Sequence, residues 1–481
     1  MRSPEGDPRQ RRGLRSYRST CDVMAEHSER KLFGTDGIRG VANKHPMTPE
    51  VAFKLGGALV VQARERGRDR PVILVGKDTR ISGYLFETSL AAGICAYGGD
   101  VLLTGPIPTP AVARLTTTLQ ADSGAMISAS HNAFEDNGIK VFGPDGFKLD
   151  DSAEAQLEWL MSEVRHARYD RPMGALVGAA RRVDRARDIY ETCLKAAVPA
   201  TLSFKGLRIV FDGAHGAAYA SGPDVLADLG AEVETLGVAP NGTNINANVG
   251  ATAPERCAAL VREKRADVGI AVDGDADRAV FIDETGTVVD GDAILALCAL
   301  DRLRTGRLQG KAMVATVMSN LGLERALQRE GGRVERCAVG DRYVVEALRK
   351  SGLTFGGEQS GHLVFLEHAT TGDGLMSALQ MLAVILREDR PLSELAAAAL
   401  DRVPQVLRSE VMPTRRPLNT LRRAQDVIRA AESALGTEGR VLVRWSGTEP
   451  KLRVLVEGPE AGAIVDIASS ILSAARTDLQ A

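Results

Sequence analysis

The sequence predicts an α/β protein: three similar units in which strands alternate with helices, followed by a smaller α+β domain. Apolar, β-rich runs recur along the chain, each followed by an amphipathic stretch rich in alanine and leucine, and after Leu400 this alternation ends. Glycine makes up 49 of the 481 residues, above the about 7% of an average protein. The glycines gather where predicted strands end, which is where α/β proteins place ligand-binding loops.

Three cycles of strand and helix support the three α/β units. The strand PVILVG at 71–76 precedes a helical stretch at 84–98, and LRIVFDG at 207–213 precedes one at 221–230. A third cycle begins with KAMVATV at 311–317. The apolar periodicity distinguishes the strands from the helices, and such alternation is typical of layered α/β domains.

Residues 401–481 follow another order. A strand around SEVMP is followed by a helix at 418–435, by the strands RVLVRWSG and LRVLVEG, and by a final helix from Glu460. This order predicts a separate small α+β domain. We therefore divide the chain into a disordered extension and four domains, at 1–30, 31–187, 188–290, 291–400 and 401–481.

Charge and hydropathy exclude several classes of partner. The chain has 60 Lys and Arg against 62 Asp and Glu, a formal net charge of −2, so no general field attracts it to nucleic acid or to an anionic membrane. Apolar runs such as 294–300 are much shorter than the roughly 20 residues that span a bilayer. We expect neither a nucleic-acid partner nor a membrane span.

The six cysteines are far apart and form no CxxC pair, which argues against a zinc site, a redox motif or a disulfide framework. A reducing cytoplasm fits this usage. Residues 1–30 are rich in arginine but lack the apolar core of a secretory signal, and their acidic residues disfavour a transit peptide. We predict that they are disordered and that Met24 is an alternative start.

The segment GAMISASHNAFEDNGIKVFGPDG (124–146) presents Ser130 and His131 after an apolar strand. A hydroxyl in such a loop can be an exposed nucleophile with backbone amides facing an anion, although SHN by itself is most often only a turn. Lys140 lies ten residues later and can return to the same loop. It offers either a positive charge for phosphate or a proton-transfer group.

The segment ADVGIAVDGDADRAVFID (266–283) places three carboxylates directly after an apolar run. Asp273, Asp275 and Asp277 alternate, so an extended loop turns all three to one side. Hard oxygen ligands suit Mg²⁺, and a Ser130 oxygen or its phosphate can complete the set. The alternative is an EF-hand loop, which the strand-like flanks disfavour.

Two further loops carry polar side chains between glycines. In FGGEQSGHLVF (355–365), Glu358, Ser360 and His362 suit sugar hydroxyls, although a solvated strand connection is the plainer interpretation. The loop RWSGTEPKLRV (444–454) combines hydroxyls, backbone amides and arginine forks, the components of a phosphate cradle. The residues of this cradle are Arg444, Ser446, Gly447, Thr448 and Arg453.

Arg39 and Arg80 lie in other glycine-rich loops, and Arg278 directly follows the three aspartates; each offers positive charge where a phosphoryl group transfers. Two motifs are missing: the chain has neither GxxxxGK[ST] nor GxSxG. A P-loop kinase and an α/β-hydrolase are therefore disfavoured.

Taken together, the four loops resemble the α-D-phosphohexomutase family, whose four-part pattern is matched in order by SASHN, DGDADR, GEQSGH and RWSGTEPKLR over residues 31–481. KLFGTDGIRG, VGDRYV and PNGTNIN are most similar to bacterial members that act on glucosamine phosphates. Two departures, Ala133 and Ala276, remove no ligand. The resemblance implies three α/β domains with mixed sheets around a central cleft and a C-terminal domain resembling the TATA-box-binding-protein fold.

The resemblance also implies roles for the residues of the four loops. Ser130 is expected to be a phosphoserine, to hold Mg²⁺ with the three aspartates, and to act with Lys140 or His362 as proton partner. Arg39 or Arg278 is expected to stabilise the transition state. Glu358 and Ser360 are expected to bind the sugar, and the cradle to bind the non-reacting phosphate.

The implied reaction converts glucosamine 6-phosphate to glucosamine 1-phosphate through a 1,6-bisphosphate of glucosamine or glucose, supplying UDP-N-acetylglucosamine and the cell wall. The rivals are a phosphomannomutase/phosphoglucomutase, a serine-phosphoenzyme phosphatase and a non-catalytic sensor. The expected partners are small sugar phosphates, and the expected state is a cytoplasmic monomer or homodimer.

Overall fold

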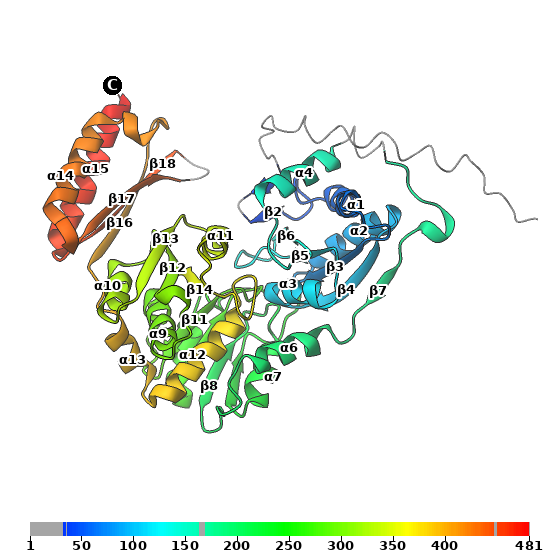
Figure 1. Cartoon of the computed structure of the whole chain (residues 1–481), viewed down its shortest axis with the longest axis horizontal. Helices are drawn as coiled ribbons and strands as arrows, with labels where there is room; N and C mark the ends of the chain where they lie inside the picture. Colours follow the sequence, from blue (N-terminus) through cyan, green and yellow to red (C-terminus); the bar gives the residue numbers. More distant parts are fainter. Residues whose placement is uncertain (1–31, 35, 163–168, 447–449, 481) are drawn as a thin grey trace, which may run out of the picture.

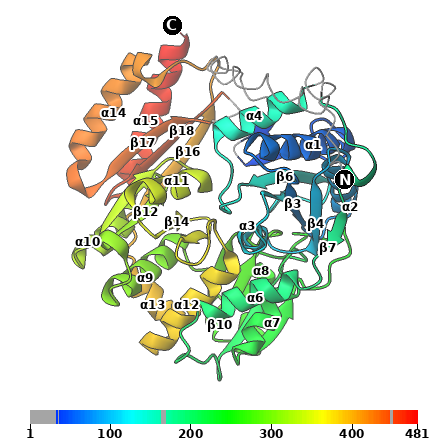
Figure 2. The ribbon, with the colours of Figure 1, turned by 45° about the vertical axis from the view of Figure 1, so that its right-hand side comes forward.

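The computed structural model describes residues 32–34, 36–162, 169–446 and 450–480. The predicted disordered extension and the cradle residues Gly447 and Thr448 lie outside the described residues. Four sheets follow one another along the chain, and Figure 2 shows them arranged around the middle of the molecule.

The first sheet has seven strands in the order β1-β2-β6-β5-β3-β4-β7 and is mixed. Its strands are β1 Phe33–Gly34, β2 Gly37–Val41, β3 Val72–Lys77, β4 Asp100–Pro106, β5 Ser123–Ile127, β6 Asp136–Phe142 and β7 Ala180–Arg182. The helices are α1 Pro49–Glu65, α2 Ser82–Ala96, α3 Thr109–Thr118 and α4 Asp151–Met161, followed by a 3₁₀ turn, η3 Gly174–Leu176. The hairpin β5–β6 pairs Met126 with Lys140, so Lys140 returns beside the loop that ends β5.

The second sheet has the order β11-β10-β8-β9, in which only the β10–β11 pair is antiparallel. Its strands are β8 Arg208–Asp212, β9 Glu232–Leu236, β10 Val268–Val272 and β11 Ala279–Asp283. Its helices are α6 Ala186–Ala196, α7 Ser221–Asp228 and α8 Glu255–Lys264. The carboxyl end of β10 carries the aspartate loop.

The third sheet has the order β13-β12-β14-β15, with β12 Ala312–Thr316, β13 Arg333–Cys337, β14 Phe355–Glu358 and β15 His362–Phe365. Its helices are α9 Gly291–Arg304, α10 Leu321–Arg329, α11 Asp341–Ser351, α12 Gly374–Glu388 and α13 Leu392–Ala399, with a 3₁₀ turn, η4 Gln309–Lys311. Side-chain caps begin two of these helices: Asn320 accepts from the Gly322 amide at 2.9 Å, and Asp373 from the Met376 amide at 3.0 Å.

The C-terminal sheet is antiparallel, in the order β16-β18-β17. It consists of β16 Gln405–Val411, β17 Arg440–Trp445 and β18 Lys451–Glu457, with helices α14 Arg422–Leu435 and α15 Ala461–Gln480 and the 3₁₀ turns η5 Leu418–Thr420 and η6 Gly436–Glu438. Figure 1 shows this unit at one end of the molecule, beside α10 and β13.

The hydrophobic cores divide the molecule differently from the sheets. One cluster runs from Leu74 and Phe142 in the first unit through Phe211 and Phe281 in the second to Phe355 in the third. The C-terminal unit has its own cluster, built on residues such as Val454 of β18 and Ile471 of α15. The three α/β units are thus bound together by shared apolar burial, and the C-terminal unit is not part of that core.

The predicted α/β architecture with mixed sheets and a distinct C-terminal unit is confirmed. The predicted strands at 71–76, 207–213 and 311–317 correspond to β3, β8 and β12. No helix in the described part of the chain is long and apolar enough to cross a membrane.

Candidate active site

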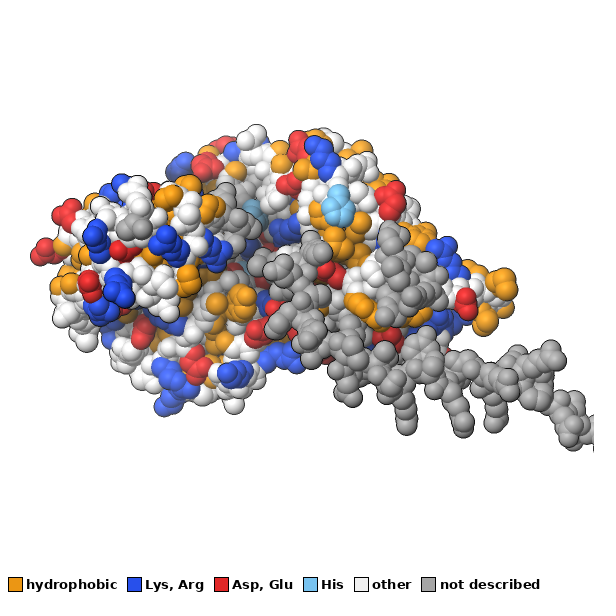
Figure 3. Space-filling view, turned by 90° about the horizontal axis from the view of Figure 1, so that it is seen from above, with side chains coloured by type: hydrophobic (Ala, Val, Ile, Leu, Met, Phe, Trp, Pro, Cys, Tyr) orange, Lys and Arg blue, Asp and Glu red, His pale blue; other side chains and the backbone are white. Residues whose placement is uncertain are grey.

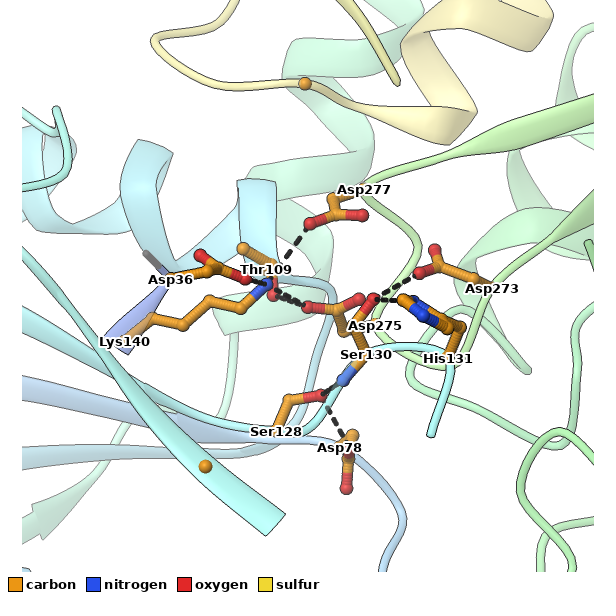
Figure 4. Close-up of polar contacts among 12 residues, drawn as sticks. Asp36, Asp78, Thr109, Ser128, Ser130, His131, Lys140, Asp273, Asp275 and Asp277 are labelled. Atoms are coloured by element: carbon orange, nitrogen blue, oxygen red, sulfur yellow. Dashed lines mark hydrogen bonds and ion pairs between the residues drawn. The ribbon is translucent and has the colours of Figure 1, made fainter. Parts of the chain in front are cut away.

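Ser130 lies in the turn that follows β5 and adopts a left-handed backbone conformation, with φ of 51°. Its hydroxyl donates to Asp273 Oδ2 at 2.6 Å, and its amide donates to Ser128 Oγ at 2.9 Å (Figure 4). Ser128 in turn donates to Asp78 Oδ2 at 2.7 Å. The first and second α/β units therefore meet at the predicted nucleophile.

Arg80 stabilises the Ser130 turn through hydrogen bonds from its side chain to the backbone of the turn. Its side chain is fully buried, pairs with Asp78 at 2.9 Å, and donates to the carbonyl oxygen of Ser130 at 2.8 Å. It also donates to the carbonyls of Asn132 and Ala133, and Asn246 shares two of these acceptors. The hydrogen bonds of Arg80 thus go to Asp78 and to the backbone that carries Ser130; that its charge also acts on a transferring phosphoryl group stays a prediction.

Replacing Arg80 by alanine is expected to lower the free energy of unfolding by about 3–5 kcal/mol, because Asp78 would remain as a buried, unpaired charge. Urea unfolding measures this change. Arg114→Ala, on the exposed side of α3, is the control, with an expected change within about 0.5 kcal/mol. An equal loss in both variants would contradict the bracing role of Arg80.

The three aspartates converge, but not by the extended loop that the alternation predicted. Residues 273–277 form a turn in which the Ala276 amide donates to the Asp273 carbonyl at 2.9 Å, and Ala276 has φ of 56°. One carboxylate oxygen from each aspartate lies within 4.8 Å of those of the other two, and all three residues are buried. Strands β10 and β11 flank the turn, so the EF-hand alternative is wrong.

The chemistry of this cluster fits a metal ion. Asp275 Oδ1 and Asp277 Oδ1 are buried without a hydrogen-bond partner, and such orphaned carboxylate oxygens are costly unless a cation binds them. Burial, together with the charges of Asp277 and Asp275, raises the pKa of Asp273 to about 8. The triad could therefore hold a divalent cation through hard oxygen ligands.

Lys140 supplies the nearest cation. Its Nζ lies 2.9 Å from Asp275 Oδ2, 3.2 Å from Asp277 Oδ2 and 3.3 Å from Asp36 Oδ2. Burial lowers the pKa of Lys140, but these carboxylates outweigh it and raise the pKa well above its ordinary value. Thr109, at the start of α3, donates to Asp275 Oδ2 at 2.5 Å.

A second lysine connects the first and third units. Lys148 Nζ lies 2.5 Å from Asp36 Oδ1 and also pairs with Asp341 at the start of α11. Next along α11, Arg342 pairs with Asp151 and, at 2.7 Å, with Glu154. The VGDRYV motif therefore ties the third unit to the first.

His362 is buried on β15, and both ring nitrogens face protein groups. Nε2 accepts from the Gly372 amide at 3.1 Å, and Nδ1 lies 3.7 Å from Asp277 Oδ1. Burial lowers its pKa, but Asp277 and Asp341 produce a net rise. His362 thus lies beside Asp277 with its ring held by the Gly372 amide.

A cleft of about 480 Å³ adjoins the aspartate triad, since Asp277 lines it. Side chains of both signs surround a hollow in the middle of the molecule (Figure 3). The cleft is lined by Asp36, Arg39, Asp277, Arg278, Gly340, Asp341, Glu358 and His362, among others. Glu358 Oε1 accepts from the Gly340 amide at 2.9 Å, while Ser360 is exposed in the turn between β14 and β15.

The cleft arginines are placed differently from one another. Arg39 pairs with Asp36 in the first unit. The backbone amide of Arg278 donates to Asp273 Oδ1 at 3.2 Å, and its side-chain Nε lies 3.8 Å from Asp277 Oδ1. Arg278 Nε makes no hydrogen bond. Arg278 thus has donor capacity left for an anion in the cleft.

The described cradle residues lie elsewhere. Arg444 and Arg453 are paired across β17 and β18, and Ser446 is buried. None of these three lines the cleft. The structure therefore brings together Ser130, Lys140, the aspartates, the cleft arginines, His362 and Glu358, whereas the three described cradle residues lie outside the cleft.

Sequence reasoning missed several residues that complete the cluster. Asp36, Thr109, Asn246 and Asp341 all contact site residues. Three of them lie in glycine-containing segments that were noted only as family resemblances: KLFGTDGIRG, PNGTNIN and VGDRYV. The sequence signal that could have identified these three site residues is a polar side chain inside a glycine-containing segment.

Comparison with known proteins identifies the family. Models of phosphoglucomutase/phosphomannomutase match along the chain: the alpha/beta/alpha domains I, II and III at residues 30–168, 188–286 and 290–403, and the C-terminal domain at 406–474. A phosphoglucosamine mutase from Sorangium cellulosum (strain So ce56) is 56% identical over 462 residues, 96% of each protein. The chain belongs to the phosphoglucosamine mutase branch of the α-D-phosphohexomutase family. It is therefore a mutase, as the four loops predicted.

Solved structures share the phosphohexomutase fold. A phosphoglucomutase/phosphomannomutase family protein from Burkholderia thailandensis has a TM-score of 0.78 at 24% identity, over 93% of this chain and 97% of the other. The N-acetylphosphoglucosamine mutase of Aspergillus fumigatus, solved with GlcNAc-6P and magnesium, has a TM-score of 0.63 at 18% identity, over 94% and 96%. At these identities the likeness concerns the fold.

Proposed function

We propose that this phosphohexomutase interconverts glucosamine 6-phosphate and glucosamine 1-phosphate through a phosphorylated Ser130. The observation that carries the proposal is the Ser130 hydroxyl, 2.6 Å from Asp273 within a buried aspartate triad beside a charged cleft. A phosphoryl group on that oxygen would lie among cationic side chains that can offset its charge. The names of the most similar relatives support the amino-sugar substrate.

The transfer balances as two half-reactions. In the first, the bond between phosphorus and Ser130 Oγ breaks as the sugar 1-hydroxyl oxygen bonds to phosphorus, giving a 1,6-bisphosphate. In the second, the turned bisphosphate returns its 6-phosphoryl group to Ser130. We assign Lys140 to relay the hydroxyl proton: its ammonium gives one proton to Ser130 Oγ as that oxygen leaves, and then takes up the proton of the attacking sugar hydroxyl, while Asp36, Asp275 and Asp277 stabilise its charge.

Asp273, Asp275, Asp277 and the oxygen on Ser130 would hold Mg²⁺. When bound, Mg²⁺ supplies positive charge beside the transferring group. His362 orients Asp277. Arg39 and Arg278 stabilise the charge on the phosphoryl group as it transfers. Glu358 and Ser360 bind sugar hydroxyls. The magnesium in the A. fumigatus neighbour supports the choice of metal.

The cradle of Arg444, Ser446, Gly447, Thr448 and Arg453 would bind the phosphate that is not transferring. We propose four domains at 31–187, 188–290, 291–400 and 401–481, since each range contains one sheet. We also propose that the enzyme works in the cytoplasm as a monomer or homodimer and binds no nucleic acid. Glucosamine or glucose 1,6-bisphosphate is its intermediate and activator. Its product supplies UDP-N-acetylglucosamine for the cell wall.

The test is kcat/KM for glucosamine 6-phosphate, glucose 6-phosphate and mannose 6-phosphate, each with Mg²⁺ and a hexose 1,6-bisphosphate. We expect glucosamine 6-phosphate to be preferred by at least about tenfold, or about 1.4 kcal/mol. Preference for either other sugar would contradict the assigned substrate. Phosphate release without isomerised sugar would indicate a phosphatase instead.

A further inference from the structure

Lys148 and Lys140 lie on the same side of one hairpin. The strand β6 ends at Phe142, and the chain returns so that Lys148 is bridged to Phe142 in antiparallel sense. Residues that face each other in an antiparallel pair point to the same side of the sheet, as do residues two apart along a strand. The two lysines are therefore directed toward the same region.

The carboxylate of Asp36 joins the two lysines. Its Oδ1 lies 2.5 Å from Lys148 Nζ. Its Oδ2 lies 3.3 Å from Lys140 Nζ (Figure 4) and also pairs with Arg39. The side chains of Lys148 and Lys140 are only 11% and 1% exposed, so solvent screens these contacts little. Because each lysine takes a different oxygen, Lys148 fixes the plane of the carboxylate and so the position of Oδ2.

Asp341 holds Lys148 from the third unit. Its Oδ2 pairs with Lys148, and its Oδ1 accepts from the Arg342 amide at 2.8 Å, in the first turn of α11. The helix dipole stabilises a carboxylate at this position. The preceding amide, of Gly340, donates at 2.9 Å to Glu358 in the loop at 355–365, here called the sugar loop. The start of α11 therefore contacts both the sugar loop and Lys148.

These contacts form one continuous path from the third unit to the first. Its members, in order, are Glu358, Gly340, Asp341, Lys148, Asp36 and Lys140. Asp341 and Asp36 line the cleft, but Lys148 does not. Any effect of Lys148 on the reaction must therefore pass through the carboxylates that it contacts.

Adhesion between the two units is a plainer role for such a lysine, but other contacts already supply it. Arg342 donates to Glu154 at 2.7 Å, and the Arg349 guanidinium lies 4.1 Å from the centre of the Phe147 ring. Neither contact involves Asp36. Adhesion alone thus does not explain why a second, largely buried lysine is placed on the carboxylate that contacts the first.

We propose that Lys148 and Asp341 are positioning residues that couple the sugar loop to the proton relay. Lys148 acts on Lys140 through Asp36, and Asp341 holds Lys148 in place. The inference rests on the proposed role of Lys140. Without Lys148, Arg39 draws the released carboxylate toward itself, and Lys140 loses one of the three carboxylates that fix its ammonium. Displacing a reacting group by about 1 Å can lower a rate about 10²-fold.

The experiment compares Lys148→Met with Lys148→Arg and with Arg349→Met. Arg349 is the matched control, because it also joins α11 to the segment after β6, from a side chain that is 53% exposed. We expect Lys148→Met to lower kcat for glucosamine 6-phosphate by about 10–10²-fold, with KM within about threefold. Arginine keeps the charge and should restore most of the rate, and the control should match the parent. Equal kinetics in the two methionine variants would overturn the proposal.

A double-mutant cycle with Asp36→Asn tests the path itself. If Lys148 acts through Asp36, the double variant should be no slower than Asp36→Asn alone, because the contact that Lys148 controls is already lost. Losses in kcat that multiply would mean that Lys148 only stabilises the fold, and the proposal would fail.

Asp341→Asn tests the other end of the path, and it takes the place of Lys148→Met if that variant does not fold. The substitution keeps the side-chain volume and removes the charge that holds Lys148. We expect kcat to fall about tenfold. A parental kcat in Asp341→Asn would contradict the role of Asp341.

Crystal structures of the two methionine variants give a readout that is independent of turnover. The contact between Asp36 Oδ2 and Lys140 Nζ should be lost in Lys148→Met and kept in Arg349→Met. An unchanged contact in Lys148→Met would overturn the positioning role. If the contact depends on Lys148 but the parent does not turn over glucosamine phosphates, the proposed function is refuted and the positioning role stands.

Discussion

Replacing Ser130 by alanine is expected to lower kcat by at least about 10⁴-fold, because no other group can take its place as the oxygen that carries the phosphoryl group. Ser130 is buried; its hydroxyl donates to Asp273, and its backbone amide donates to Ser128. A coupled assay for glucosamine 1-phosphate measures the rate. Intact mass spectrometry of the parent should show one added phosphoryl group, and the variant should lack it.

Ser128→Ala is the matched control two residues away. Ser128 accepts from the Ser130 amide and donates to Asp78, so its removal loosens the turn without removing the carrier oxygen. We expect a loss of about tenfold to 10²-fold in kcat, with the phosphoryl group still found on Ser130. A Ser130→Ala enzyme with full activity, or a phosphoryl group on another residue, would refute the mechanism.

Asp275→Asn is expected to lower kcat by about 10²–10⁴-fold and to abolish stabilisation by Mg²⁺. The substitution keeps the side-chain volume but removes a charge that faces Lys140 and Thr109. A site that binds metal only in the folded state stabilises it by about 2.7 kcal/mol at a hundredfold excess over Kd. Thermal unfolding with and without Mg²⁺ measures this effect without any assay of activity.

Asp283→Asn is the control for charge removal nearby. Asp283 ends β11, and its Oδ1 accepts from the amides of Thr285 and Thr287, both at 2.9 Å. It is not one of the triad. The Mg²⁺-dependent rise in unfolding temperature should therefore persist in this variant. The same rise in Asp275→Asn would contradict the metal site.

The parts of the site predicted from sequence are those that local patterns determine. An apolar run shows where a strand ends, so the loops of Ser130 and Asp273 could be placed at strand ends. A short hairpin returns the chain, so Lys140 could be expected near Ser130, and the structure pairs it with Met126 on β5.

The parts that were missed depend on how the units assemble. Thr109 and Asp275 are 166 residues apart, and Lys148 and Asp341 are 193 apart. No periodicity relates such pairs, because the packing of one unit on another decides them. The aspartate loop shows the same limit at short range: alternation predicted an extended segment, but the turn at Ala276 brings the carboxylates together instead.

The left-handed turn at Ser130 has a consequence for the rate of each catalytic cycle. Its carbonyl is held by Arg80 and Asn246 and its amide by Ser128, so the orientation of the hydroxyl is fixed while the chain folds. The entropy lost in aligning a nucleophile is then part of the free energy of folding and not of the activation barrier. Folding stability and turnover are therefore linked at this turn, and substitutions that relax it should make the protein slower without changing any group that reacts.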